Sequence, residues 1–156
     1  MGSALAWILL AVLAALLLAA CWCDLRARTI PNGLNLAVAL LAVPFWWSLG
    51  LAFWPDVALH LGVAALVFAL FAIAFALGAM GGGDVKLVAA IALWLPYQSV
   101  LALLFLMSVA GGALTLFMLI RHKLARRTEQ LEIPYGLAIA FGGLWLISER
   151  FLNQFG

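Results

Sequence analysis

The sequence predicts an all-α membrane protein, a polytopic bundle of six transmembrane helices in which the fourth span is short. Hydrophobic residues make up 69% of the 156 residues and charged residues only 9%, against about 45–50% and about 25% in soluble domains. A soluble fold of this length could not bury so much apolar surface. The net charge of +2 gives no argument for nucleic-acid binding, and residues 1–156 are expected to form a single transmembrane domain.

The lengths of the apolar runs predict the individual spans. A membrane-spanning helix needs about 20 mostly apolar residues. The five longer runs are Ala4–Trp22, Leu34–Phe53 (interrupted by Pro44), Val57–Gly78, Ser99–Ile120 and Pro134–Ile147. The remaining run, Val85–Leu95, has eleven residues and reaches about 16 Å, half of a hydrocarbon core of roughly 30 Å. The fourth span is therefore expected to be short or to begin inside the protein.

The distribution of basic residues predicts the direction of the spans. Seven of the eight Lys and Arg residues follow odd-numbered spans, and only Arg150 lies on the other side. These seven are Arg26, Arg28, Lys86, Arg121, Lys123, Arg126 and Arg127. Because cytoplasmic loops carry an excess of Lys and Arg, these connections are expected in the cytoplasm and both termini outside.

Two acidic residues, Asp24 and Asp84, lie near the ends of predicted helices. Two complete spans separate them, so both are expected at the cytoplasmic face. Ionisable groups at membrane depth are costly and indicate function. Two carboxyl groups that share a site can share one proton, so that the ionised group activates water while the protonated group binds a peptide carbonyl. Such a pair hydrolyses an amide without a metal or a covalent intermediate, although sequence does not assign which Asp is the base.

The residues around each aspartate allow structural explanations as well. Asp84 follows three glycines, Gly81, Gly82 and Gly83, which predict a break in the helix and a backbone that a substrate strand can approach closely. The alternative is tight helix packing through the pair Gly78 and Gly82.

The neighbours of Asp24 and the lysine after Asp84 are equally open to two interpretations. Asp24 could pair with Arg26 or Arg28 in a capped turn. Lys86 could stabilise an ionised carboxylate or contact substrate, or it could serve only as a positive-inside anchor. Asn32 could donate a hydrogen bond to a carboxylate or close the turn before Gly33.

Three motifs together resemble the type IV prepilin peptidase family. Gly81-Gly82-Gly83-Asp84 is similar to the Gly-x-Gly-Asp signature of intramembrane aspartic peptidases. The segment Asp24–Asn32 resembles the first-aspartate motif of the prepilin peptidases, and Ile133–Ala140 resembles the opening of their last helix. A single Gly-x-Gly-Asp would be weak evidence, but the three motifs occur in the family's order and span most of the chain.

The resemblance implies an aspartic endopeptidase with Asp24 and Asp84 as the catalytic pair. It implies that the substrates are prepilins or pseudopilins, cleaved after a short basic leader at the cytoplasmic face of the bacterial inner membrane during pilus biogenesis. Glu129 or Glu132 is then a candidate contact for the leader. No metal or other cofactor is expected.

The length of the chain and its cysteines narrow the resemblance further. Larger family members carry a cysteine-rich cytoplasmic insertion and methylate the new N-terminus, whereas this chain has only Cys21 and Cys23. We therefore expect a small peptidase of the Flp or tight-adherence type without methyltransferase activity, partnered by the prepilin and the lipid bilayer.

Two other functional classes compete with the peptidase. A small proton-coupled transporter could use the same two carboxylates, although no acidic residue near the membrane midplane continues a path from them. A non-catalytic membrane scaffold would need neither aspartate.

Overall fold

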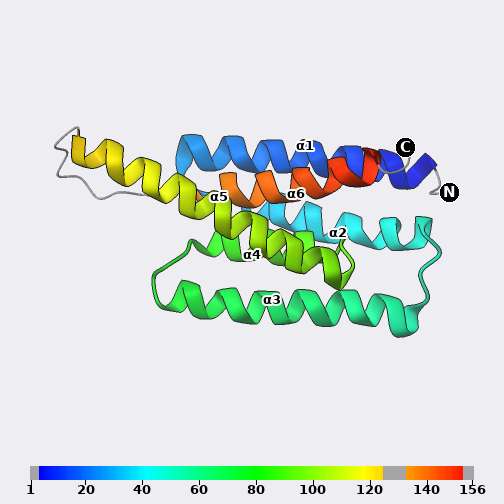
Figure 1. Ribbon diagram of the computed structural model, residues 1–156. Helices are drawn as coiled ribbons and strands as arrows, with labels where there is room; N and C mark the ends of the chain where they lie inside the picture. Colours follow the sequence, from blue (N-terminus) through cyan, green and yellow to red (C-terminus); the bar gives the residue numbers. More distant parts are fainter. Residues whose placement is uncertain (1–3, 125–132, 153–156) are drawn as a thin grey trace.

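The computed structural model describes residues 4–124 and 133–152, and the regular secondary structure of this part of the chain is helical (Figure 1). The helices are α1 (Ala4–Ala27), α2 (Asn32–Ser48), α3 (Ala58–Ala76), α4 (Gly82–Ala92), α5 (Tyr97–Leu124) and α6 (Tyr135–Leu152). A wide turn, η1 (Phe53–Val57), leads into α3. No strand occurs among the described residues, and the predicted all-α class with a short fourth helix is confirmed.

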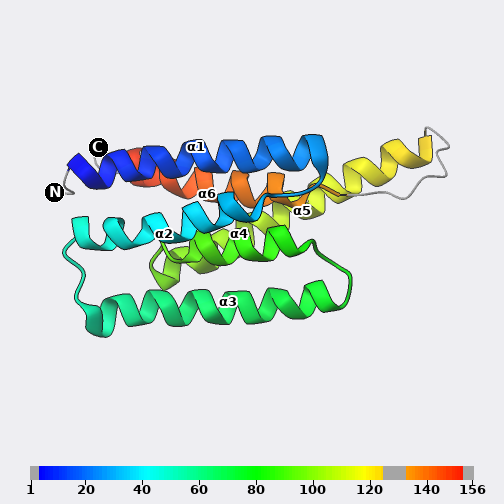
Figure 2. The same cartoon turned by 180° about the vertical axis from the view of Figure 1, so that it is seen from behind.

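The helices form an elongated bundle around α4. In both views of the ribbon, α1 and α6 run side by side along one edge and α3 lies along the opposite edge (Figures 1 and 2). The short α4 lies between them and contacts α2, α3 and α6. The C-terminal end of α5 projects beyond the other helices (Figure 1).

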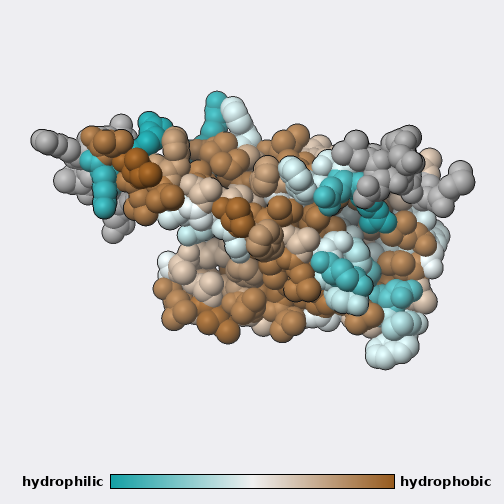
Figure 3. All heavy atoms as spheres, viewed as in Figure 1, coloured by the Kyte–Doolittle hydropathy of each residue, from teal (hydrophilic) through white to brown (hydrophobic). Residues whose placement is uncertain are grey.

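The surface of the bundle is apolar, as expected for a membrane protein. Three stretches of the described chain are long and apolar enough to cross a membrane: α1, Phe53–Ala76 and α5. Large apolar side chains point outward, and Leu66 and Phe105 are 70% and 69% exposed. The face in Figure 3 is accordingly covered largely by hydrophobic residues. In water such a surface would aggregate, whereas lipid covers it without cost.

The short α4 is the most buried helix, and its C-terminal end is held by indole hydrogen bonds. Leu87, Val88 and Ile91 are at most 1% exposed. The Trp94 indole N–H, just after α4, donates to the Val38 carbonyl of α2 at 2.9 Å. In return, the Trp46 indole N–H of α2 donates to the Leu93 carbonyl at 2.8 Å. These bonds satisfy carbonyls and indole groups away from water, so the eleven-residue helix can end inside the protein.

The glycine segment differs from the prediction. Gly82 and Gly83 form the first turn of α4, and Gly81 is the extended residue that caps it. The helix break lies earlier, where α3 ends and Gly78 has φ +72°. The predicted unwound backbone is therefore present at Gly81 but wrong for Gly82 and Gly83, because the Asp84 side chain caps the helix and these two glycines form its first turn.

Two further sequence predictions are corrected or lie outside the described chain. The second helix ends at Ser48 rather than at Phe53, since Gly50 takes a left-handed φ of +67° that helices do not continue through. A side chain at Gly78 would meet nothing within 4 Å, so this glycine does not provide the proposed packing pair with Gly82. Arg126, Arg127, Glu129 and Glu132 lie outside the described residues.

Candidate active site

The last turn of α1 holds Asp24, which is 4% exposed. The helix continues beyond the predicted end of the apolar run and ends at Ala27. It ends there because Arg28 takes a left-handed conformation with φ +54°. The Arg28 backbone N–H donates to the Asp24 carbonyl at 2.9 Å. This closure turns the chain back toward α4 immediately after Asp24.

The beginning of α6 points its backbone at the Asp24 side chain. The N–H groups of Gly136 and Leu137 donate to the carboxylate. The first N–H groups of a helix have no partner within the helix, and the positive end of the helix dipole favours an anion there. Gly136 permits this approach, since a Cβ at that position would lie 2.8 Å from Asp24 Oδ2 and 3.0 Å from Asp24 Cβ.

The first turn of α4 holds Asp84, which is 8% exposed. The Asp84 backbone N–H donates to the Gly81 carbonyl at 3.1 Å, while the Gly81 N–H donates to the Asp84 carboxylate. This reciprocal pair is the acidic half of a capping box, in which the third residue of a helix binds the cap. The cap fixes the carboxylate at the start of the helix.

The connection between α1 and α2 packs against this first turn of α4. A Cβ at Gly83 would lie 3.2 Å from Ile30 Cβ and 3.3 Å from the Ile30 backbone nitrogen. The Asn35 side-chain amide of α2 donates to the Gly83 carbonyl at 3.0 Å. Gly83 thus allows the chain that follows Asp24 to lie directly on the helix that carries Asp84.

These contacts bring both aspartates to one cavity of about 570 Å³. The charge of Asp24 opposes ionisation of Asp84, whereas the positive charge of Arg28 attracts the Asp24 carboxylate. One oxygen of each, Asp24 Oδ2 and Asp84 Oδ1, is buried without a hydrogen-bond donor among the described residues. Buried polar atoms are normally satisfied, and unsatisfied ones call for an explanation such as catalysis. The cavity is also lined by Ala27, Thr29, Gly78, Ala79, Met80, Gly81, Ile133 and Tyr135.

Of the other predicted site residues, only Gly81 lines the described cavity. Lys86 Nζ donates to Asn32 Oδ1 at 2.8 Å, so these two residues bind each other and line a different groove. The Arg26 guanidinium lies over the Trp22 ring, 4.6 Å from its centroid. Of the glycines, Gly81 lines the cavity, whereas a side chain at Gly82 would meet the Phe75 ring at 3.3 Å.

Sequence reasoning missed three residues that position the aspartates: Gly136, Asn35 and Ile30. Gly136 stood in the motif at residues 133–140, but nothing in that motif indicated what the glycine contacts. Asn35 carried a signal that could have been used, since its amide stands within the long apolar run that begins at Leu34. The structure buries this side chain, which is 5% exposed.

Metal-binding side chains are not grouped in residues 4–124 and 133–152. No cluster there contains three or more His, Cys, Asp or Glu residues. Cys21 and Cys23 are both free thiols and partly buried.

The fold and the site define the class: a helical membrane protein with two buried carboxylates at one cavity. Residues 11–116 match the type IV leader peptidase family, which shows that the chain belongs to this family of peptidases. The matched range contains Asp24 and Asp84 but ends before α6. Comparison with curated proteins and with solved structures found no match.

Proposed function

We propose that the chain is an aspartic endopeptidase that cleaves the leader from Flp-type prepilins or pseudopilins. Asp24 and Asp84 activate the water, and the site faces the cytoplasm at the inner membrane. One observation carries the proposal. Two carboxylates from distant parts of the chain line the same cavity, and each keeps a buried oxygen to which no group in residues 4–124 and 133–152 donates.

The contacts of the two aspartates support a division of the acid and base roles between them. Asp24 accepts two backbone N–H groups at the positive end of α6 and interacts with Arg28, all of which stabilise a carboxylate anion. Asp84 accepts one backbone N–H and faces the charge of Asp24. Two adjacent carboxylates cannot both ionise easily, so Asp24 holds the negative charge and Asp84 carries the shared proton.

Hydrolysis then follows from this arrangement. Asp84 donates its proton as a hydrogen bond to the scissile carbonyl, and Asp24 takes a proton from the attacking water. The new C–O bond gives a tetrahedral intermediate whose oxygen is protonated by Asp84. Collapse of the intermediate breaks the C–N bond while the proton on Asp24 passes to the leaving nitrogen, and the remaining hydroxyl proton returns to Asp84. Both carboxyl groups end in their starting states, as general acid–base catalysis requires.

Substitution of each aspartate by asparagine tests the proposal. Asp24→Asn and Asp84→Asn keep the shape of the side chain, and each is expected to lower the cleavage rate of a purified prepilin by about 10³-fold, within the usual range for loss of a general acid or base. The readout is the gel shift that accompanies loss of the leader.

A third aspartate provides the matched control. Asp56 lies in the turn before α3, where its Oδ2 accepts the Ala52 N–H, and Asp56→Asn is expected to cleave within about twofold of wild type, as expected for a residue remote from the reacting atoms. Cleavage at the wild-type rate by either site variant would remove that aspartate from the mechanism.

A further inference from the structure

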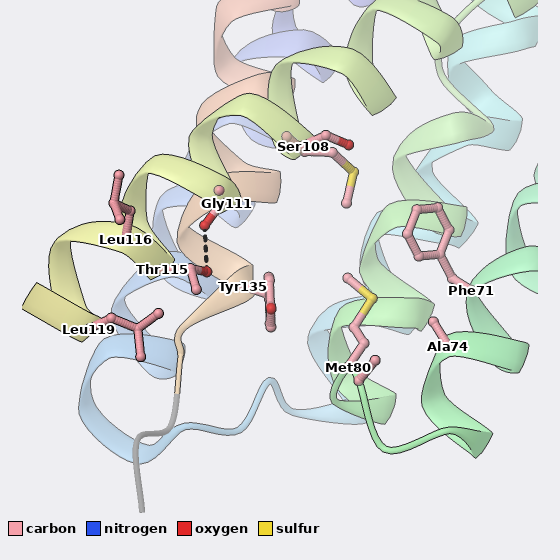
Figure 4. Close-up of a pocket in the computed structure, with 12 residues that line it drawn as sticks. Phe71, Ala74, Met80, Ser108, Gly111, Thr115, Leu116, Leu119 and Tyr135 are labelled. Carbon is pink, nitrogen blue, oxygen red and sulfur yellow. Dashed lines mark hydrogen bonds between the residues drawn. The ribbon is translucent and has the colours of Figure 1, made fainter.

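A second cavity, also of about 570 Å³, adjoins the one that holds the aspartates. It opens between α3 and α5, and Tyr135 of α6 lines it as well (Figure 4). Ala79, Met80 and Tyr135 line both cavities. We call this second cavity the α3–α5 groove; Phe71 and Ala74 line it from α3, and α5 lines it between Met107 and Leu119.

The lining of the α3–α5 groove selects an apolar occupant. Its two hydroxyl-bearing residues on α5 already donate within their own helix. Ser108 donates to the Leu104 carbonyl at 2.6 Å, and Thr115 donates to the Gly111 carbonyl at 2.7 Å (Figure 4). Two methionines, Met80 and Met107, also line the groove. Their unbranched side chains adapt to irregular apolar surfaces. The groove therefore has the chemistry of a site for aliphatic side chains.

The shape of the groove suits a helix. Gly112 lines it, and a Cβ there would meet nothing within 4 Å. Small residues at such positions let a membrane helix approach closely. The stretch of α5 from Met107 to Leu119 is about 18 Å long, which accommodates about three turns of helix.

We propose that the α3–α5 groove binds the apolar helical segment that follows the scissile bond of the substrate. This inference rests on the proposed peptidase function. The groove shares a wall with the carboxylate cavity at Ala79, Met80 and Tyr135. Tyr135 lies beside Gly111, and α5 lines the groove on both sides of this point, from Met107 to Leu119. A lipid tail or a second copy of the chain would also be apolar, but only a peptide substrate must run continuously from this groove to the two aspartates.

Filling the groove at Gly112 tests the proposal kinetically. Gly112→Leu projects into the open space, and Gly62→Leu makes the same change on exposed α3 surface that does not line the groove. We expect Gly112→Leu to lower kcat/KM for a full-length prepilin about tenfold, chiefly through KM, because uniform binding is lost. Gly62→Leu is expected to stay within about twofold of wild type.

The substrate supplies the second half of this kinetic test. A prepilin truncated after the first few residues of its apolar segment is expected to be a poorer substrate, and Gly112→Leu should not weaken it further, since both changes remove one interaction. Equal effects of Gly112→Leu and Gly62→Leu on the full-length prepilin, or additive effects of Gly112→Leu and the truncation, would overturn the groove assignment.

Disulfide cross-linking tests binding without catalysis. In an Asp84→Asn background with Cys21 and Cys23 changed to Ala, a single Gly112→Cys is combined with single cysteines along the apolar segment of the prepilin. Cross-links at helical spacing from Gly112→Cys, and none from Gly62→Cys, are expected. Cross-links from Gly112→Cys to another copy of the chain, or none to the prepilin, would overturn the inference.

The two proposals fail separately. If the prepilin cross-links in the groove but wild-type protein does not cleave it, the groove assignment stands and the peptidase function fails. If cleavage depends on both aspartates but no cross-link forms, the peptidase function stands and the groove assignment fails.

Discussion

Replacing Gly136 with alanine tests whether the close approach of α6 to Asp24 is required for activity. The added Cβ would lie 2.8 Å from Asp24 Oδ2 and 3.0 Å from both Asp24 Cβ and Cγ. Non-bonded carbon atoms prefer about 3.5–4.0 Å, so either α6 or the Asp24 side chain must retreat by about 0.5–1 Å. The two N–H groups that α6 donates to the carboxylate would be displaced by the same movement.

A retreat of this size is expected to reduce activity strongly while the fold survives. A misplacement of about 1 Å can cost about 100-fold in rate, which corresponds to about 2.7 kcal/mol in activation free energy. We expect Gly136→Ala to lower kcat for prepilin cleavage by about this factor. Initial rates of leader removal at saturating substrate measure kcat, and far-UV circular dichroism and thermal unfolding in detergent show whether the helices remain.

Gly33→Ala is the control, because it adds the same methyl group in the first turn of α2, where the new Cβ would meet nothing within 4 Å. Its rate is expected to stay within about twofold of wild type. The reasoning is refuted if Gly136→Ala cleaves as fast as Gly33→Ala while Asp24→Asn is inactive. In that case the contact between α6 and Asp24 would have no part in catalysis.

Two further predictions concern the charge state of the pair and the role of Lys86. The rate of cleavage is expected to follow a bell-shaped pH profile, because the pair of carboxyl groups titrates as a unit. The rate falls at low pH, where both groups are protonated, and at high pH, where both are ionised. A rate independent of pH from acid to alkaline conditions would contradict proton sharing. Lys86→Met should lower the free energy of unfolding in detergent by about 1 kcal/mol, because the hydrogen bond to Asn32 is lost. In a double-mutant cycle, adding Asn32→Ala to Lys86→Met should cause no further loss of stability. Loss of cleavage in Lys86→Met with unchanged stability would instead indicate that Lys86 acts on the substrate.

The sequence by itself determined the class of the fold and where the chemistry had to be sought. Hydropathy is a local property, so the apolar runs predicted the helices and the short fourth one without any knowledge of their packing. Parity then placed Asp24 and Asp84 at the same end of the bundle, since two spans return the chain to its starting side. The structure has both residues at one cavity, and their catalytic role stays a prediction.

The tertiary structure alone decided how closely the parts of the site approach one another. Gly136 contacts Asp24 and Gly83 contacts Ile30, and each pair joins segments whose distance in space is not encoded in local pattern. The same holds for the start of α4. The glycines at residues 81–83 favour a break by propensity, but Gly82 and Gly83 become helical through the cap that Asp84 supplies. The α3–α5 groove could not be predicted from the sequence either, since a space between two helices depends on how both helices are packed.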